Sequence, residues 1–328
     1  MKKIISICSA LLMLTFVKAA SQDTIPFVHD PVMAYENGIY YIYSTGQNIS
    51  EMTSTDRRHW TFLRGGLLHT IPVWTHCIPD FKNHIWAPDV IRWHGKWWMA
   101  YSCSSFGMNS SAIGLLQAKT LWKNVWKDEG MIIKSMSSDH YNAIDPNFVI
   151  DGNDQPWLVF GSFWDGIQLV PLNHNMHVQK NIKPRTIACR YAHVPSNIIN
   201  PTSKNAGVNA IEAPFVFKHN GWYYLFVSWD YCCRGIQSTY RVVVGRSRKI
   251  MGPYLDAEGK NMLDGGGTLV IQGDKKKYEA AGHCAVYHFG NNDIFICHGY
   301  NISEGGASTL IQRRIQWQSD GFPILEKE

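Results

Sequence analysis

Residues 212–228 read EAPFVFKHNGWYYLFVS, and the same pattern recurs along the chain. An acidic residue and a proline precede two runs rich in aromatic and β-branched residues, with Asn220 and Gly221 between the runs. Runs of this composition favour β-strands. Asn-Gly supplies the backbone freedom that a tight hairpin turn needs. The stretch therefore predicts a strand, a turn and a second strand.

Four other stretches share this organisation. They read HDPVMAYENGIYYIYS (29–44), WAPDVIRWHGKWWMAYS (86–102), IDPNFVIDGNDQPWLVFGS (144–162) and, more weakly, GHCAVYHFGNNDIFICH (282–298). Along the chain, the prolines of all five stretches, with Cys284 standing in place of a proline in the last, are 57, 58, 68 and 70 residues apart. Each unit has room for four short strands, and four-stranded units repeated radially form a β-propeller. The sequence thus predicts an all-β fold, a five-bladed β-propeller, whose last strand, around 309–317, is the candidate for pairing with the first blade.

Composition excludes several other classes of protein. Of the 328 residues, 45% are hydrophobic and 17% are charged, which argues against disorder, a coiled coil or a collagen-like repeat. A solenoid would need shorter and more uniform repeats. The formal charge of +5 includes three lysines of an N-terminal segment that we expect to be removed. The remaining small excess, without a basic face, gives no reason to expect nucleic acid as a partner.

The N-terminus has the features of a signal peptide. Lys2 and Lys3 precede a largely apolar segment at 4–17, and Val17 and Ala19 place small residues at the −3 and −1 positions of a cleavage site. The alternative is a membrane anchor, but the apolar run is shorter than the ~18 residues of a spanning helix. We expect residues 1–19 to be a signal peptide, residues 20–328 to be one propeller domain, and the product to be a secreted monomer without a membrane span.

Seven cysteines remain after this cleavage, an odd number that argues against a scaffold built on disulfides. A mature chain of this length can bury a core of its own. Cys232 and Cys233 are adjacent, and the sequence leaves open whether they form a vicinal disulfide or stay as two thiols. No CxxC or HExxH motif indicates zinc.

The strand starts of a propeller meet at one mouth of its central channel. We expect Asp30, Asp145, Glu212 and His283 to meet there, with Trp86 in the second unit. Burying three acids together is costly unless they act on something, although Asp-Pro and Glu-Ala-Pro alone could be turn chemistry. Two carboxyl groups flanking a bond are the machinery of glycoside hydrolysis. Trp86, Phe163 and Trp164 could stack on sugar rings or pack in the blades.

These residues resemble glycoside hydrolase family 43, and within it the endo-1,5-α-L-arabinanases. The resemblance covers nearly the whole mature chain and is carried by the motifs VHDP (28–31), WAPD (86–89), NAIDP (142–146), GSFWDGI (161–167), EAPF (212–215) and DYCCRG (230–235). It implies a five-bladed propeller that cleaves internal α-1,5-L-arabinofuranosidic bonds of arabinan with inversion. One departure is Ala281-Gly282-His283, where the family pattern has Pro-Gly-His.

The resemblance also implies roles for individual residues. Asp30 would be the general base, Glu212 the general acid, and Asp145 the residue that orients the acid and tunes its pKa. A calcium ion would lie in the channel, held by His283 and mostly by water. The implied substrate contacts are Trp86, Asn142, Ala143, Ile144, Ser162, Phe163 and Trp164.

Two alternatives remain open at this stage. One is an exo-acting arabinofuranosidase or β-xylosidase of the same family, because the sequence does not show whether the cleft is open at both ends. The other is a non-catalytic, lectin-like propeller that binds carbohydrate. Blades one and four are separated by blade five in a closed ring, so we expect Asp30 and Glu212 to face each other across the channel. A spacing of ~6.5–9.5 Å leaves room for a water and favours inversion.

Overall fold

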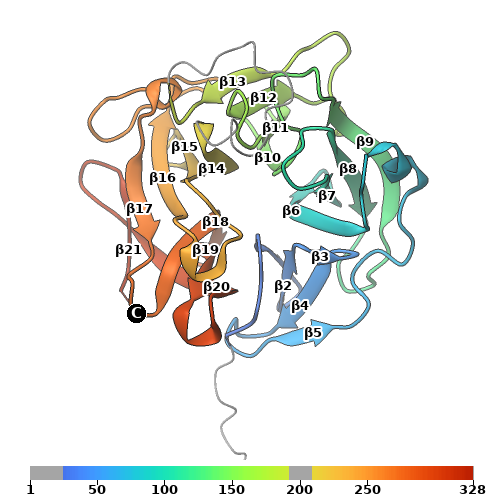
Figure 1. The fold of residues 1–328 in the computed structure, drawn as a ribbon, viewed down its shortest axis with the longest axis horizontal. Coiled ribbons are helices and arrows are strands. Elements are labelled where there is room, and N and C mark those ends of the chain that lie inside the picture. Colours follow the sequence, from blue (N-terminus) through green and yellow to red (C-terminus); the bar gives the residue numbers. More distant parts are fainter. Residues whose placement is uncertain (1–24, 192–208, 328) are drawn as a thin grey trace, which may run out of the picture.

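A computed structural model describes residues 25–191 and 209–327 of the chain. The predicted signal peptide, residues 1–19, lies outside the described residues. Figure 1 shows five sheets arranged as blades around a central axis, which confirms the predicted five-bladed β-propeller. None of the helices in the described ranges has the length and apolar character that a membrane span requires.

The blades follow one another along the chain. Blade one contains β1 (Val32–Glu36), β2 (Ile39–Ser44), β4 (Ser50–Ser54) and β5 (Thr61–Leu63), and blade two contains β3 (Gly46–Gln47), β6 (His84–Trp93), β7 (Lys96–Cys103), β8 (Ser111–Ala118) and β9 (Lys127–Ser135). Blade three contains β10 (Asn147–Ile150), β11 (Pro156–Phe160), β12 (Ile167–Pro171) and β13 (Arg185–Ala188).

The last two blades have the same meander. Blade four contains β14 (Ile211–His219), β15 (Trp222–Trp229), β16 (Arg241–Ser247) and β17 (Thr268–Gln272), and blade five contains β18 (Tyr278–Phe289), β19 (Asn292–Asn301), β20 (Ala307–Trp317) and β21 (Pro323–Leu325). Short 3-10 helices occur in the connections: η1 (Val73–Cys77), η3 (Gly235–Gln237), η4 (Met262–Asp264) and η5 (Ile302–Glu304).

The hairpins between the first two strands of the blades explain part of this topology. In blade four, His219 pairs with Trp222, so only Asn220 and Gly221 form the turn. Their φ angles are 47° and 74°, the left-handed combination of a type I′ turn, whose twist matches the flanking strands. Asn37 and Gly38 form the same turn in blade one, with φ of 51° and 84°.

The segment around 309–317 takes part in ring closure, as the sequence predicted, although it is not the last strand. β20 does not leave its blade, because it pairs with β19 and β21. The closure comes from the N-terminal side, where Phe27 forms a bridge with Thr309 and the Val28 amide donates to the Ser308 carbonyl over 3.1 Å. The first strands of neighbouring blades are also in contact, β1 with β18 and β6, and β14 with β10 and β18. Blade five therefore lies between blades one and four, as expected.

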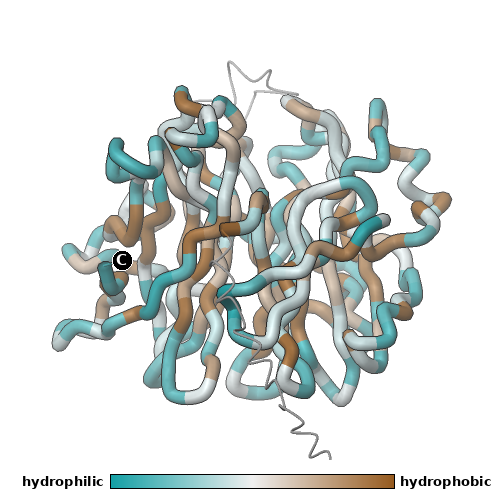
Figure 2. Tube along the Cα trace, turned by 90° about the horizontal axis from the view of Figure 1, so that it is seen from below, coloured by the Kyte–Doolittle hydropathy of each residue, from teal (hydrophilic) through white to brown (hydrophobic). Residues whose placement is uncertain are grey.

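The core consists of the apolar faces of neighbouring blades. Phe226 of blade four and Phe295 of blade five are fully buried, with ring centroids 6.3 Å apart. Burying each such side chain contributes about 1.5–3 kcal/mol. In Figure 2 the hydrophobic residues follow the strands, whereas the connecting turns at both ends are mainly hydrophilic. The packed blades thus form a rigid support for the loops at the channel mouth.

Candidate active site

In each blade, one residue in or just before the innermost strand has its backbone in the left-handed region, and we call it the strand-start residue. The φ angles are 54° at Asp30, 41° at Ala87, 55° at Asp145, 52° at Ala213 and 53° at His283. Residues other than glycine seldom adopt such angles, and they gather at functional sites when they do. The strand pairing shifts register around three of these residues, in blades two, four and five. Irregularities of this kind redirect side chains.

The strand register corrects the expectation that the three acids and His283 all occupy the same position in their blades. Asp30, Asp145 and His283 occupy equivalent positions, but Glu212 lies one residue before the equivalent position, which is Ala213. Trp86 is likewise one residue before Ala87. The proline alignment contained this offset, because the motifs EAP and WAP place alanine where DP places aspartate. Glu212 reaches the channel mouth from its own register position.

In four of the five blades, a histidine, threonine or serine of the preceding blade accepts a hydrogen bond from the amide of the strand-start residue. The hydrogen bonds are Asp30 N to His298 Nδ1 (3.1 Å), Ala87 N to Thr45 Oγ1 (2.8 Å), Asp145 N to Ser102 Oγ (3.0 Å) and His283 N to Ser228 Oγ (2.8 Å). These bonds tie neighbouring blades together at the channel and hold the left-handed residues in place.

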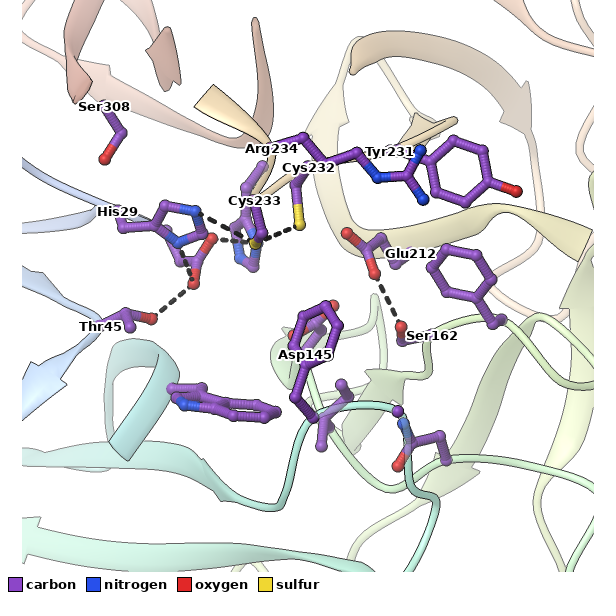
Figure 3. Close-up of a pocket in the computed structure, with 18 of the residues that line it drawn as sticks. His29, Thr45, Asp145, Ser162, Glu212, Tyr231, Cys232, Cys233, Arg234 and Ser308 are labelled. Atoms are coloured by element: carbon purple, nitrogen blue, oxygen red, sulfur yellow. Dashed lines mark hydrogen bonds and ion pairs between the residues drawn. The ribbon is translucent and has the colours of Figure 1, made fainter. Parts of the chain in front are cut away.

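Blade four has a different arrangement. The Ala213 amide donates to Asp145 Oδ2 over 3.1 Å. Ser162, the counterpart of Ser102 and Ser228 in the repeat, instead donates its hydroxyl to Glu212 Oε2 over 2.7 Å. Asp145 therefore fixes the backbone beside Glu212, and Ser162 contacts the Glu212 carboxyl group directly (Figure 3).

Asp30 is surrounded by groups that stabilise its ionised form. His29 Nδ1 lies 2.9 Å from Oδ2, and His283 Nδ1 lies 2.9 Å from Oδ1. The Thr45 hydroxyl donates to Oδ2 as well. Burial alone would raise the pKa of Asp30, but the attraction of His283 and His29 holds the pKa well below its usual range. Asp30 is therefore a carboxylate at neutral pH.

The pKa values of Glu212 and Asp145 are raised, in contrast to that of Asp30. Burial raises the pKa of Glu212, although hydrogen bonds from Tyr240 and Ser162 oppose the shift. Burial is also the first cause that raises the pKa of Asp145 to about 8, and the charges of Glu212 and Asp30 add to it. Glu212 thus contributes to the raised pKa of Asp145, and burial is the leading cause for both groups. One cavity holds an ionised carboxylate and two carboxyl groups that favour the protonated form.

The residues around these acids line a central cavity of about 650 Å³. Ten of the eleven predicted site residues line it: Asp30, Trp86, Asn142, Ile144, Asp145, Ser162, Phe163, Trp164, Glu212 and His283. Ala143 is the exception and corrects the prediction. It is fully buried in the core between blades two and three, and its amide donates to Ser135 Oγ over 2.9 Å.

One wall of the cavity carries aromatic and cationic side chains. The rings of Phe163 and Tyr231 are 6.1 Å apart, and the Arg234 guanidinium lies 3.9 Å from the centre of the Tyr231 ring. Figure 3 shows Tyr231 and Arg234 on the same side as Glu212. Phe106 lines the cavity with 77% of its surface exposed. These flat apolar faces suit contacts with sugar rings.

Sequence reasoning missed several residues around the acids. His29 could have been found, because it directly precedes Asp30. His298 also left a signal, because it takes the place of the serine that ends the other four repeat units. Tyr240 and Tyr300 left none, because only the packing of blades brings Tyr240 Oη to 2.7 Å from Glu212 Oε1 and Tyr300 Oη to 3.1 Å from His29 Nε2.

The structure does not assemble protein ligands around His283. Among the described residues, the groups able to hold an ion are His29 with Asp30 and His298, and His29 with Cys232 and Cys233. His283 Nδ1 is engaged with Asp30, which leaves Nε2 as its available ligand atom. An ion at His283 would need water for most of its coordination.

The adjacent cysteines are free thiols in the structure. Their Sγ atoms are 2.6 Å apart, and both residues line the central cavity. The hydrogen bond with Cys232 and the proximity of His29 lower the pKa of Cys233 to about 5. The Cys233 amide donates to Tyr300 Oη over 2.7 Å, which links this loop to the surroundings of Asp30.

Comparison with known proteins identifies relatives of this propeller. The chain is 38% identical over 300 residues to the extracellular endo-α-(1→5)-L-arabinanase 1 of Bacillus subtilis, covering 90% of this chain and 87% of that protein. The structure of an exo-1,5-α-L-arabinanase from a bovine ruminal metagenomic library is 47% identical, with a TM-score of 0.86 over 93% of this chain and 98% of that one. A Cellvibrio cellulosa α-L-arabinanase complexed with arabinohexaose is 36% identical, with a TM-score of 0.87 and coverage of 92% and 96%.

The match extends over the whole propeller. A sequence model of the glycosyl hydrolases family 43 matches residues 24–323, which include the inner strands of all five blades and every residue discussed around the central cavity. The chain belongs to family 43 of the glycosyl hydrolases, and it is a glycoside hydrolase.

Proposed function

We propose that this glycoside hydrolase cleaves internal α-1,5-L-arabinofuranosidic bonds of arabinan by a single displacement with inversion. The observation that carries the proposal is the contrast between Asp30 and Glu212 in one cavity. Histidines hold Asp30 ionised, whereas burial favours protonated Glu212. When two carboxyl groups in one site have different pKa values because of their surroundings, one can act as the acid and the other as the base. The named activities of the relatives supply the substrate class.

Glu212 is the general acid of the proposed reaction. It donates its proton to the glycosidic oxygen as the bond to the leaving chain breaks. Tyr240 Oη and Ser162 Oγ, each 2.7 Å from one carboxyl oxygen, fix the direction of the group. Both bonds also stabilise the carboxylate that remains after the proton has been transferred.

Asp30 is the general base. It removes a proton from the water that attacks the anomeric carbon on the face opposite the leaving group. His29, His283 and Thr45 hold its two oxygens, so the carboxylate cannot turn away from the water. Asp145 is a positioning residue, because its Oδ2 accepts the amide of Ala213, next to Glu212.

Product stereochemistry tests the single displacement. Proton NMR during turnover of an α-linked arabino-oligosaccharide should show the β-anomer as the first product. The α-anomer as first product, or a glycosyl-enzyme trapped on Asp30, would contradict the mechanism.

Exo-action is the second candidate, and the 47% identity to a ruminal exo-arabinanase favours it. Sizing the early products from linear arabinan distinguishes the two. A ladder of mixed oligomers indicates endo-action, and one short product of constant length indicates exo-action. No product at all would leave the carbohydrate-binding propeller as the remaining explanation. The substrate contacts proposed for either mode are Trp86, Asn142, Ile144, Ser162, Phe163 and Trp164.

Calcium is proposed as a bound ion beside His283. Nε2 is the available ligand atom, and the cavity carboxyls provide a negative field, but Ca²⁺ prefers oxygen ligands, so water would supply most of the shell. The ion would contribute positive charge at the channel. Treatment with a chelator should lower activity, and calcium should restore it. If His283→Ala retains both full activity and the bound ion, His283 is not the ligand.

The proposed setting of the enzyme is outside the cell. The supports are the signal-like residues 1–19 and the extracellular name of the Bacillus relative. Residues 20–328 would form one monomeric propeller domain. N-terminal sequencing of the exported protein should begin at Ala20, and light scattering should give the mass of a single chain.

A further inference from the structure

The cavity wall beside Asp30 carries two thiols and an imidazole that the proposed hydrolysis does not use as acid or base. Cys233 Sγ lies 2.6 Å from Cys232 Sγ and 3.7 Å from His29 Nε2. All three ligand atoms lie within 4.8 Å of one another. Figure 3 shows the Cys233 sulfur between His29 and Cys232. Because all three residues line the central cavity, a small ion could reach them from solvent.

The chemistry of these donors selects a class of ion. Thiolate sulfur and imidazole nitrogen are the ligands of Zn²⁺ and softer ions, whereas calcium and magnesium take oxygen. Tetrahedral zinc, with bonds of about 2.3 Å to sulfur and 2.0 Å to nitrogen, places these atoms roughly 3.5 Å apart. The 3.7 Å between Cys233 and His29 is close to this separation. The two sulfurs would have to move apart by roughly an ångström to share the ion.

The surroundings of His29 match those of a metal-bound histidine. Such histidines usually donate their second ring nitrogen to a carboxylate, which fixes the tautomer and raises the basicity of the ligand atom. His29 Nδ1 lies 2.9 Å from Asp30 Oδ2. Nε2 is the atom that faces Cys233 and Tyr300. Burial alone would lower the pKa of His29, but Asp30 and Cys233 raise it, so a metal ion would have to displace the proton on Nε2.

We propose that His29, Cys232 and Cys233 form a binding site for a thiophilic divalent cation such as Zn²⁺ or Cd²⁺, and that occupancy inhibits the enzyme. Binding releases to solvent the remaining thiol protons and the proton on His29 Nε2. The cation and its remaining coordination position would lie in the cavity beside Asp30, in the space that the substrate and the attacking water would use. The inhibition rests on the proposed role of Asp30, whereas the binding itself does not.

Cadmium is the probe for the binding step, because thiolate-bound Cd²⁺ has a charge-transfer absorption band in the ultraviolet. The full chain, kept reduced with a phosphine, should bind one Cd²⁺ with this band and lose arabinan hydrolysis as the band saturates. Cys233→Ala and Cys232→Ala should each weaken the binding by at least about 10–100-fold. Cys77→Ser is the matched control, because Cys77 is exposed and does not line the cavity; it should retain the band.

A second measurement uses the unmodified chain and does not depend on how the variants fold. Alkylation of Cys233, followed by mass spectrometry of its peptide, should slow when Cd²⁺ is present, while alkylation of Cys77 should not change. The proposed site would be overturned if Cd²⁺ left the alkylation of Cys233 unchanged. It would also be overturned if the charge-transfer band persisted in a variant with both Cys232→Ala and Cys233→Ala.

Oxidation of the same pair is the competing outcome. If inhibition is reversed by a reductant and not by a chelator, and the chain is lighter by two hydrogen atoms, the pair forms a disulfide and the metal site is refuted. Failure of the proposed hydrolysis is recognised separately, since the untreated chain would then not cleave arabinan while Cd²⁺ binding stayed intact.

Discussion

Blade four differs from the other four blades at the point where its first strand begins. In blades one, two, three and five, a serine, threonine or histidine of the preceding blade accepts the strand-start amide. In blade four the carboxyl group of Asp145 accepts it, and the serine of the preceding blade contacts Glu212. The same contact between neighbouring blades therefore supports ring assembly in blades one, two, three and five, whereas in blade four it also positions Glu212.

This difference explains how a repetitive fold can hold one acid apart from the others. Asp30 and Asp145 occupy equivalent positions in their blades. An acid at the equivalent position of blade four, which is Ala213, would have the same backbone surroundings as these two. Glu212 lies one residue earlier, where Ser162 and Tyr240 reach both carboxyl oxygens. Burial raises the pKa of Glu212 there, whereas the neighbouring histidines hold the pKa of Asp30 well below its usual range.

Glu212→Gln should have the largest effect. An amide of the same shape keeps one oxygen to accept a hydrogen bond from Ser162 or Tyr240, but it cannot protonate a leaving group, so arabinan turnover should fall by about 10²–10⁴-fold. An aryl arabinofuranoside with a good leaving group should lose far less. Initial rates on both substrates check this, with exposed Glu258→Gln as the matched control. Equal losses on both substrates would remove Glu212 from the acid role.

Asp145→Ala should come next and should affect stability as well as rate. It leaves the buried Ala213 amide without its acceptor, which costs about 1–3 kcal/mol, and it releases the backbone that carries Glu212. Asp145→Asn keeps an acceptor oxygen and should recover most of the stability. Denaturant unfolding and kcat for the two variants separate the hydrogen bond from the charge. Equal destabilisation by Ala and Asn would contradict the anchoring role.

The pH profile should reflect the contrast between the two acids. Burial raises the pKa of Glu212, so the protonated acid persists above the usual glutamate value of about 4.3, and kcat/KM should fall as pH rises through the shifted pKa. The histidines lower the pKa of Asp30, so loss of the base should begin only at a pH below its usual value of about 3.9. An alkaline limb at the ordinary glutamate pKa would contradict the assignment.

The sequence predicted the fold and most of the site, because both depend on local patterns. Aromatic runs around Asn-Gly turns determine the hairpins, and Asp30 and Asp145 stand out before their prolines. The offset of Glu212 is visible in the proline alignment, because the residue directly before the proline is aspartate at Asp30 and Asp145 but alanine at Ala213. Ala143 was expected in the site with its neighbours, but it is buried in the core between blades two and three. Tyr240 and Tyr300 were out of reach, because only blade packing brings them to the acids.

The smallest predicted effect separates two serines that look alike in the repeat. Ser162 donates to Glu212, and this bond lowers the pKa of the acid. Ser162→Ala should therefore raise that pKa and move the alkaline limb of kcat/KM to higher pH, with a modest loss of rate. Ser102 accepts only the amide of Asp145 among the contacts described here, so Ser102→Ala should cost about 1–3 kcal/mol of unfolding free energy and leave the alkaline limb in place. Full pH profiles and unfolding curves of both variants test this. If both move the limb equally, or if only Ser102→Ala moves it, the hydroxyl of Ser162 has no special relation to the acid, and blade four does not differ from its neighbours in function.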